Sequence, residues 1–376
     1  MSERALDSAS GGLRSRRQPA AGAPPFISVI VPVRNEEAFI GDTLEQVLNQ
    51  RYDPERFEVL VADGGSTDDT RAVVAAMRRE YPNLRLLENP GRLSSAGRNV
   101  AIRAARGDVV LLIDGHCEVD NPAYLADLAD AFQRSGADCV GRPQPLDVRG
   151  ATRLQRAVAL ARSSRLGHHP ASHIWSEREG FVPPQSVAVA YRRSVFERVG
   201  LFDESFDACE DVELNHRVAR AGMNCFFTPR VRVRYHPRDT LAGLFRQMVR
   251  YGRGRMRLLR KHPDTFSAPG FVPAAFLAGV VFGPLLACWS AWLGVLYAGV
   301  LGAYALAVLL CSVALALRAR EVALLPVLPV VFLAVHYGAG AGVWWEALAG
   351  STRRTPAAAE LLPADGRAAS TSRTAA

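Results

Sequence analysis

The C-terminal third of the sequence contains 53 consecutive residues, from Thr265 to Leu317, without a single Asp, Glu, Lys or Arg. A second charge-free stretch of 24 residues follows, from Val322 to Trp345. The core of a bilayer takes about 20 apolar residues per helix. We therefore expect a membrane domain over residues 265–347. Its three helices should lie at about 270–292, 295–317 and 322–345.

Basic residues indicate how this membrane domain is oriented. Seven Arg or Lys residues and no acidic residue lie between Thr240 and His262, among apolar residues at helical spacing. The pattern predicts a basic amphipathic helix over 240–264, which lies on anionic lipid, forms the positive flank of the first span, or does both. Since positive flanks stay inside, we expect a multi-pass protein of the cell inner membrane with a cytosolic N-terminal domain.

The third apolar segment fits this scheme less well than the first two. Three spans would place the C-terminal tail outside, although Arg353 and Arg354 favour the inside. The segment also contains His336 and three nearby glycines. We expect a third span, with a partial or re-entrant element as the alternative.

The composition narrows the kinds of partner and of cellular environment that fit this chain. The net charge of +8 is concentrated directly before the apolar run, which favours a membrane surface over a nucleic acid partner. The six cysteines form no C-x-x-C pair and are expected to be buried, reduced thiols. Residues 1–25 and 348–376 are predicted to be disordered tails, and no secretory signal is evident at the N-terminus.

Residues 26–239 alternate between apolar runs and helical segments. Strands are predicted at 27–31, 57–62, 84–88 and 109–113, and the helices between them at 36–50, 69–80 and 94–106. This alternation predicts an α/β fold with a doubly wound, mostly parallel sheet and a Rossmann-like nucleotide-binding half. Ligands bind beyond the carboxyl ends of such strands, and two of these ends carry Asp63 and Asp114.

These two strand ends carry candidate binding motifs. Asp63 begins D-G-G-S-T-D-D-T, where a carboxylate can accept hydrogen bonds from a nucleotide and glycines allow a close approach; a helix-capping turn is the alternative. Asp114 begins D-G-H, in which His116 can join it in holding Mn²⁺ or Mg²⁺ on a diphosphate. Alternatively, His116 only packs and Asp114 binds the metal alone or with Glu118 or Asp120.

A third motif begins a predicted helix at 210–221. Glu210 and Asp211 are adjacent carboxylates at its N-terminus, where the helix dipole favours their ionised forms. They could supply the general base of a transfer reaction, or they could be surface acids at a capped helix start. His168, His169 and His173 lie in a probable loop and are interpreted as structural or acceptor-loop residues rather than as a metal site.

Taken together, these motifs resemble those of family 2 glycosyltransferases with the GT-A fold, and within that family the succinoglycan-type membrane glucosyltransferases. The resemblance covers about residues 26–265 and rests on the order and spacing of the motifs. They are Val31–Glu36, the Asp63 motif, Ala105–Asp108, Asp114–His116, Gly200–Glu204, Glu210–Arg217 and the stretch from Tyr235–Arg238 through Tyr251–Gly252.

The resemblance implies a group of residues that binds the donor, a nucleotide sugar and most simply a UDP-sugar. This donor group comprises Pro32, Glu36, Asp63, Arg98 and Asp114. Asp63 would contact the base, while Asp114 with His116 would lie at the ribose and the metal diphosphate. The family usually carries a second Asp where His116 stands, so the metal could be Mn²⁺ or Mg²⁺.

The resemblance also implies an acceptor side. Asp211 would be the general base, supported by Glu210. Gln247 and Arg250 form a Q-x-x-R-Y close to the Q-x-x-R-W of many membrane glycosyltransferases, and would lie at the acceptor or diphosphate side. Tyr251 in place of Trp favours the transfer of one sugar over processive polymer synthesis.

We therefore expect an inverting, metal-dependent transfer of a single sugar from a nucleotide sugar to a membrane-held, lipid-linked saccharide in exopolysaccharide or cell-envelope glycan synthesis. One alternative enzyme is a polyprenyl-phosphate sugar synthase. An alternative of another class is a membrane protein whose α/β domain binds a nucleotide without turnover. A transporter is disfavoured because three spans are few for a transport path.

Overall fold

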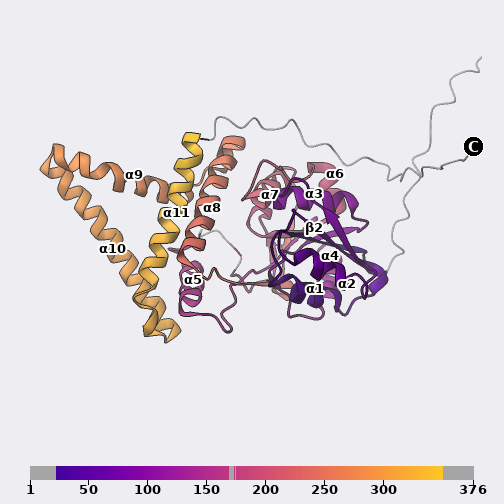
Figure 1. The fold of residues 1–376 in the computed structure, drawn as a ribbon. Helices are drawn as coiled ribbons and strands as arrows, with labels where there is room; N and C mark the ends of the chain where they lie inside the picture. Colours follow the sequence, from indigo (N-terminus) through magenta and orange to yellow (C-terminus); the bar gives the residue numbers. More distant parts are fainter. Residues whose placement is uncertain (1–22, 169–172, 174, 350–376) are drawn as a thin grey trace, which may run out of the picture.

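An eight-stranded sheet forms the centre of the N-terminal domain in the computed structural model, which describes residues 23–168, 173 and 175–349 (Figure 1). Its strand order is β3-β2-β1-β4-β8-β6-β9-β7. The strands are β1 (Ile27–Val33), β2 (Phe57–Asp63), β3 (Leu84–Glu88), β4 (Val109–Leu112), β6 (Cys139–Gly141), β7 (Gly180–Val182), β8 (Ala188–Arg192) and β9 (Cys225–Phe227). A separate two-stranded ribbon pairs β5 (Cys117–Glu118) with β10 (Arg234–Tyr235).

The four strands predicted from the sequence are parallel neighbours in this sheet, as expected. β1 pairs with both β2 and β4, and β2 pairs with β3. Alternate residues of β1 enter cores on opposite faces, with Val29 on one side and Ile30 on the other. Strands that are buried on both faces read as continuous apolar runs, which is why they were recognisable. β8 and β7 run antiparallel to their neighbours, so the sheet is mostly parallel.

Helices flank both faces of the sheet (Figure 1). They are α1 (Ile40–Leu48), α2 (Thr70–Met77), α3 (Ser94–Ala104), α4 (Tyr124–Ser135), α6 (Arg193–Val199) and α7 (Glu210–Arg220). α1 begins four residues later than predicted. Asn35 takes a left-handed φ of 57°, and the carbonyl of Glu36 accepts hydrogen bonds from the amides of Phe39 and Ile40, so a turn precedes the helix.

A helical lobe lies beside the α/β domain and contains α5 (Arg153–Ser163), α8 (Leu241–Lys261), α9 (Ala268–Trp289), α10 (Ala291–Ala319) and α11 (Leu328–Ala349). α9, α10 and α11 cover the three predicted apolar segments and are long and apolar enough to cross a membrane. α11 begins six residues later than predicted because Pro326 and Pro329 lie at its start, where a missing N–H is tolerated.

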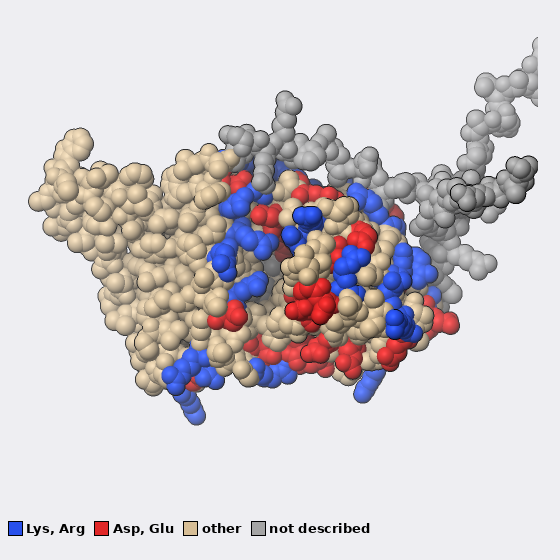
Figure 2. Space-filling model, in the orientation of Figure 1, with Lys and Arg blue, Asp and Glu red and all other residues tan. Residues whose placement is uncertain are grey.

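The arrangement of this lobe is clear in Figure 1. α9 and α10 form a V that points away from the α/β domain, and α8 and α11 run side by side between the V and the domain. Figure 2 shows that the visible face of the V is free of charged side chains except at its lower end, whereas basic residues gather where the lobe meets the charged domain. The predicted basic helix 240–264 corresponds to α8, and both predicted tails lie almost wholly outside the described residues.

Glycines let α8 and α11 approach until their backbones touch. A Cβ added to Gly252 of α8 would lie 2.1 Å from the carbonyl oxygen of Ala339. A Cβ added to Gly342 of α11 would lie 2.1 Å from the carbonyl oxygen of Val249. Real Cβ atoms do not come this close to backbone, so each position requires glycine.

We expect the substitution Gly342→Leu to destabilise the protein by about 1–3 kcal/mol or more, because the added side chain would force α11 away from α8. Gly302→Leu is the matched control, since a Cβ there meets nothing within 4 Å. Thermal unfolding of both variants in detergent would measure the difference. Equal midpoints for the two variants would contradict the close contact.

Candidate active site

Arg98 of α3 joins the end of β4 to the start of α7. One guanidinium nitrogen, Nη1, donates to Oε1 of Glu210 at 2.9 Å, and the other, Nη2, donates to Oδ1 of Asp114 at 3.3 Å. Arg98 and Glu210 are each 8% exposed. The structure therefore brings together three of the predicted site residues, two carboxylates on either side of one cation.

The second oxygen of Asp114 faces a partner that the sequence analysis gave no role. The hydroxyl of Tyr235, in β10, donates to Oδ2 of Asp114 at 2.8 Å. The edge of the His116 ring packs against Tyr235, with 5.9 Å between ring centroids. His116 uses its Nδ1 to contact Oε1 of Glu36 at 3.0 Å, which leaves Nε2 as its remaining ligand atom. The only sequence signal for Tyr235 was its place in the Y-H-P-R motif.

The two carboxylates bound to Arg98 have different proton affinities. Burial raises the pKa of Glu210; Arg98 opposes that rise without cancelling it, and the charge of Asp211 adds to it. Burial also acts to raise the pKa of Asp114, but Arg98 and His116 outweigh it and hold the pKa of Asp114 below its usual range. Asp114 is thus kept ionised, which suits a carboxylate that holds a cation.

Asp211 differs from its buried neighbour Glu210 because its side chain is exposed at the N-terminus of α7. Its Oδ1 accepts a hydrogen bond from the amide of Val212 at 2.8 Å. The residue before the pair, Cys209, has a left-handed φ of 64°, which turns the chain sharply into the helix. A carboxylate at this position is accessible and held at the end of a helix.

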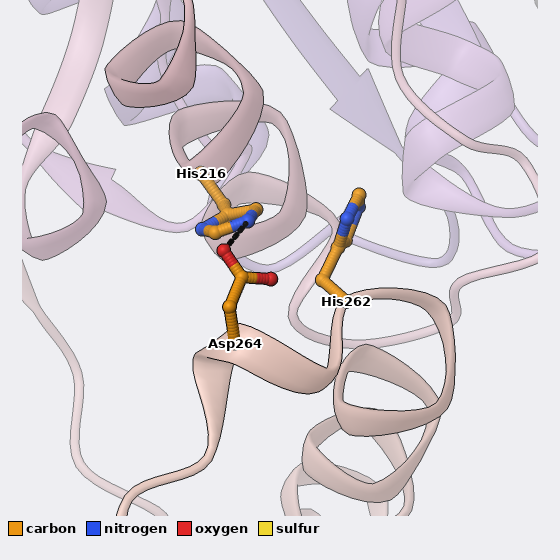
Figure 3. A group of neighbouring side chains, drawn as sticks. All are labelled: His216, His262 and Asp264. Atoms are coloured by element: carbon orange, nitrogen blue, oxygen red, sulfur yellow. Dashed lines mark ion pairs between the residues drawn. The ribbon is translucent and has the colours of Figure 1, made fainter.

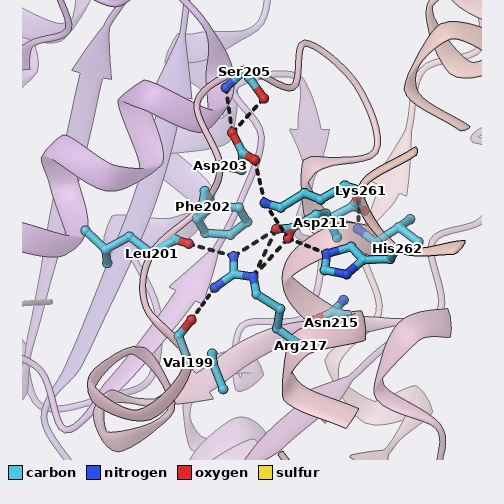
Figure 4. A network of polar contacts seen from close by, with 12 residues as sticks. Val199, Leu201, Phe202, Asp203, Ser205, Asp211, Asn215, Arg217, Lys261 and His262 are labelled. Atoms are coloured by element: carbon cyan, nitrogen blue, oxygen red, sulfur yellow. Dashed lines mark hydrogen bonds and ion pairs between the residues drawn. The ribbon is translucent and has the colours of Figure 1, made fainter. Parts of the chain in front are cut away.

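A polar network fixes the far side of α7 (Figure 4). The carboxylate of Glu213 is fully buried and contacts Lys261 at 2.9 Å and His262 at 3.0 Å, both from the end of α8. Arg217 donates to Glu213 and to the carbonyl oxygen of Leu201. These contacts lock α7, and with it the Glu210–Asp211 pair, to α8.

Asp63 lies at the same edge of the sheet, opposite Val33 in the register of β1 and β2. Its side chain is fully buried and accepts hydrogen bonds from the Ser66 hydroxyl at 2.5 Å and from Nη1 of Arg71 at 2.8 Å. Burial acts to raise the pKa of Asp63, but these two partners hold it below its usual range. The predicted contact with a base would require Ser66 or Arg71 to move aside.

The predicted acceptor-side residues lie on α8. Arg250 donates to the carbonyl oxygen of Asp207 at 2.5 Å, in the loop that precedes Glu210. Gln247 donates to the hydroxyl of Tyr251 at 3.3 Å. The Q-x-x-R-Y motif therefore touches the loop of the acidic pair through Arg250, whereas Pro32 and Glu36 lie across the site at the end of β1.

Among the described residues, one group of three side chains could ligate a metal, and the sequence analysis missed it. His216, His262 and Asp264 have ligand atoms within 4.8 Å of one another (Figure 3). Ligands of one tetrahedral zinc ion lie roughly 3.3 Å apart, so the group would have to contract. His262 and Asp264 are two residues apart, but His216 lies 46 residues upstream of His262, so no short spacing pattern joins the three. His216 belongs to α7, whereas His262 and Asp264 belong to the junction between α8 and α9.

A cavity of about 600 Å³ opens beside this group. His173, one of the predicted loop histidines, also lines it, and its ring lies 6.4 Å from that of Phe227. This placement agrees with a packing role for His173. His169 falls outside the described residues.

Comparison with known sequences gives consistent matches. The sequence model described as "Glycosyltransferase like family 2" matches residues 24–254. The succinoglycan biosynthesis protein ExoA of Rhizobium meliloti is 33% identical over 325 residues, which cover 85% of this chain and 94% of ExoA. A Methanococcus voltae dolichyl N-acetyl-alpha-D-glucosaminyl phosphate 3-beta-D-2,3-diacetamido-2,3-dideoxy-beta-D-glucuronosyltransferase is 25% identical over 319 residues, which cover 83% of this chain and 94% of that protein.

Comparison with solved structures supports the fold. A mannosyltransferase from Pyrobaculum calidifontis, solved with GDP-Man and Mn²⁺, matches with a TM-score of 0.55 at 22% identity. The match covers 88% of this chain and 90% of that one. The predicted GT-A fold followed by apolar helices is confirmed.

The contacts of Arg98 with Glu210 and Asp114, called here the Arg98 bridge, predict that substitutions at Arg98 and Glu210 have non-additive effects on the free energy of unfolding. We expect Arg98→Met to cost about 3–5 kcal/mol, because it leaves buried carboxylates without their cation. The double variant with Glu210→Gln should recover most of this loss, since the neutral amide needs no counter-charge. Thermal unfolding of the two single variants and the double variant would measure the coupling. Additive losses would contradict the bridge.

Proposed function

The chain belongs to glycosyltransferase-like family 2, and from this premise we propose that it moves a single sugar from a nucleotide sugar to a lipid-linked saccharide at the membrane. It is a glycosyltransferase of polysaccharide or glycan biosynthesis, as its family and its similarity to ExoA establish. The observation that carries the finer proposal is the exposed carboxylate of Asp211. It stands beside the Arg98-linked acids, on a helix that is bonded to α8.

The donor side would be built around Asp114. We assign Pro32, Glu36, Asp63 and Arg98 to the nucleotide-sugar pocket, because all lie at or beside the carboxyl edge of the parallel strands. A UDP-sugar is the donor that we expect. Arg98 would orient Asp114, and the buried ion pair with Glu210 would keep that orientation while the donor binds and leaves.

The residues present fit a divalent metal ion. Asp114 offers a carboxylate kept in its ionised form, and His116 offers Nε2 because Nδ1 is engaged by Glu36. A carboxylate with an imidazole suits Mn²⁺ more than Mg²⁺. When bound, the metal would neutralise charge on the leaving diphosphate.

Asp211 would act as the general base. The acceptor hydroxyl oxygen attacks the anomeric carbon of the sugar while the bond from that carbon to the diphosphate breaks. The hydroxyl proton passes to the Asp211 carboxylate, and the nucleoside diphosphate leaves on the opposite face, which inverts the configuration. Glu210 supports this role by holding the start of α7 through Arg98.

A lipid-linked acceptor is supported by the position of α8. Its Arg250 contacts the loop before the acidic pair, and its basic residues lie where the charged domain meets the apolar lobe (Figure 2). An acceptor held at a lipid surface would therefore reach Asp211 alongside Gln247 and Arg250. The similarity to a transferase that acts on a dolichyl-phosphate-linked sugar agrees with this proposal.

We expect membranes that contain this protein to release nucleotide from one donor in a panel of sugar nucleotides, with Mn²⁺ or Mg²⁺ but not with EDTA. Asp211→Asn should lower the rate by about 100- to 10,000-fold and keep nucleotide binding. The control Asp239→Asn removes an exposed carboxylate before α8 and should leave the rate unchanged.

The same assay separates the alternatives. A lipid monophosphate sugar as the product, identified by mass spectrometry, would favour a polyprenyl-phosphate sugar synthase. Binding of a nucleotide without release from any donor, in the presence of lipid extract, would favour a non-catalytic protein. Transfer to soluble acceptors only would contradict the lipid-linked acceptor.

The role of His116 can be tested separately. We expect His116→Asp, which creates the usual D-x-D, to raise the ratio of Mg²⁺-supported to Mn²⁺-supported activity, because Mg²⁺ prefers oxygen ligands. The measurement is nucleotide release over a range of concentrations of each metal. An unchanged ratio would mean that His116 only packs against Tyr235 and Glu36.

A further inference from the structure

Both ends of α11 are held by α5 and α8, two helices that are themselves bonded to the catalytic domain: Gln155 of α5 donates to the carbonyl oxygen of Pro237, and Arg257 of α8 donates to that of Ser205. In the segment that joins α10 to α11, Glu321 forms an ion pair with Arg156 of α5 at 3.1 Å, and Leu328 at the start of α11 shares a buried core with Ala157 of α5. Near the end of α11, Glu346 contacts Arg257 of α8 at 2.8 Å and Arg253 at 3.1 Å. α11 has 22 residues and is about 33 Å long, enough to cross a bilayer. Because α5 and α8 are both bonded to the same domain, they hold the two ends of α11 on the side of the membrane where that domain lies.

We propose that α11 lies flat along the cytosolic surface of the membrane beside α8, and that only the α9–α10 hairpin enters the bilayer. The protein would then cross the membrane twice rather than three times, and Ala349 would lie on the same side as the catalytic domain. This inference rests on the membrane location within the proposed function, but not on the sugar, the acceptor or the catalytic roles.

The position that α8 can take relative to the membrane supports this arrangement. The two helices run parallel, since Gly252 meets Ala339 and Arg260 donates to the carbonyl oxygen of Ala347 at 2.8 Å. Whatever depth α11 takes, α8 must share it. α8 carries seven basic residues, and each would cost about 2.5–3.5 kcal/mol at the centre of a membrane span. A shared position at the lipid surface lets these cations face anionic head groups.

The protein itself covers more of α11 than of the other two apolar helices. Half of its most apolar segment is buried inside the protein, against 11% for α9 and 17% for α10. Leu328, Val331 and Phe332 are fully buried, and they belong to a core shared with Ala157 and Val158 of α5. The apolar character of α11 is therefore accounted for largely by protein contacts, whereas that of α9 and α10 is not.

The α9–α10 hairpin has the dimensions of a membrane insert. Its helices are about 33 and 44 Å long, against a hydrocarbon core of roughly 30 Å. Trp289 and Trp292 flank the turn at Ser290 and are 87% and 73% exposed. Tryptophans gather at membrane–water interfaces, so this turn fits the head groups of the far leaflet.

Two spans also remove a conflict in the charge pattern. With three spans, Arg353 and Arg354 would lie outside, against the positive-inside rule. With two spans, they lie on the same side as Arg318, at the end of α10, and as the basic face of α8. All the basic flanks of the apolar segments then stay in the cytosol.

Reporter fusions to the full chain test the number of spans. Alkaline phosphatase, which is active only after export, should be inactive at the C-terminus and active when inserted after Ser290 in the hairpin turn. A green fluorescent protein at the C-terminus should fluoresce. Active phosphatase at the C-terminus, or inactive phosphatase in the hairpin turn, would overturn the proposal.

Spin labels measure the depth directly. Leu333 and Leu348 are exposed residues of α11 that lie about 22 Å apart along the helix axis. Labels on Leu333→Cys and Leu348→Cys, in a background without the native cysteines, should report equal depths in vesicles with anionic lipid. A depth difference approaching 22 Å would restore the third span. Neither measurement requires turnover, so a failure of sugar transfer would leave this result interpretable.

Discussion

The packing of α8 between α11 and the loop before α7, residues 205–209, is the contact on which the rest of the structure depends. Gly252 faces α11, and Gly254 faces the loop, where a Cβ would lie 2.4 Å from the carbonyl oxygen of Ala208. Because two residues turn a helix by about 200°, the two glycines open opposite faces of α8. Arg257 adds a polar link, since it binds Glu346 of α11 and the carbonyl oxygen of Ser205 in the loop. One helix thus sets the distance between the lipid surface and the acidic pair.

Within the catalytic domain, the comparable constraint is electrostatic. Arg98 is buried between Glu210 and Asp114, so its position fixes α7 relative to β4. The ion pair between Arg98 and Glu210 also makes the two neighbouring acids different. Glu210 is buried and paired, whereas Asp211 is exposed and forms no ion pair within the described part of the chain. The proposed reaction, in which the site binds a charged donor and accepts a proton, would use both kinds of carboxylate close together.

The sequence predicted those features that depend on local pattern. The parallel strands were recognisable because residues such as Val29 and Ile30 are buried on both faces of the sheet. Contacts between distant residues were not predictable in this way. The pairing of Asp114 with Tyr235 depends on how β10 pairs with β5, and the approach of His216 to Asp264 depends on how α7 meets the α8–α9 junction.

The third apolar segment illustrates the limit of hydropathy. A window of apolar residues measures how strongly a segment avoids water, but not whether lipid or protein replaces the water. Phe332 is apolar and fully buried by protein, whereas Leu310 of α10 is apolar and 60% exposed. The sequence alone makes the two residues equivalent. Glu346, the one acid in α11, marks the difference, because its arginine partners come from a helix too basic to enter the bilayer.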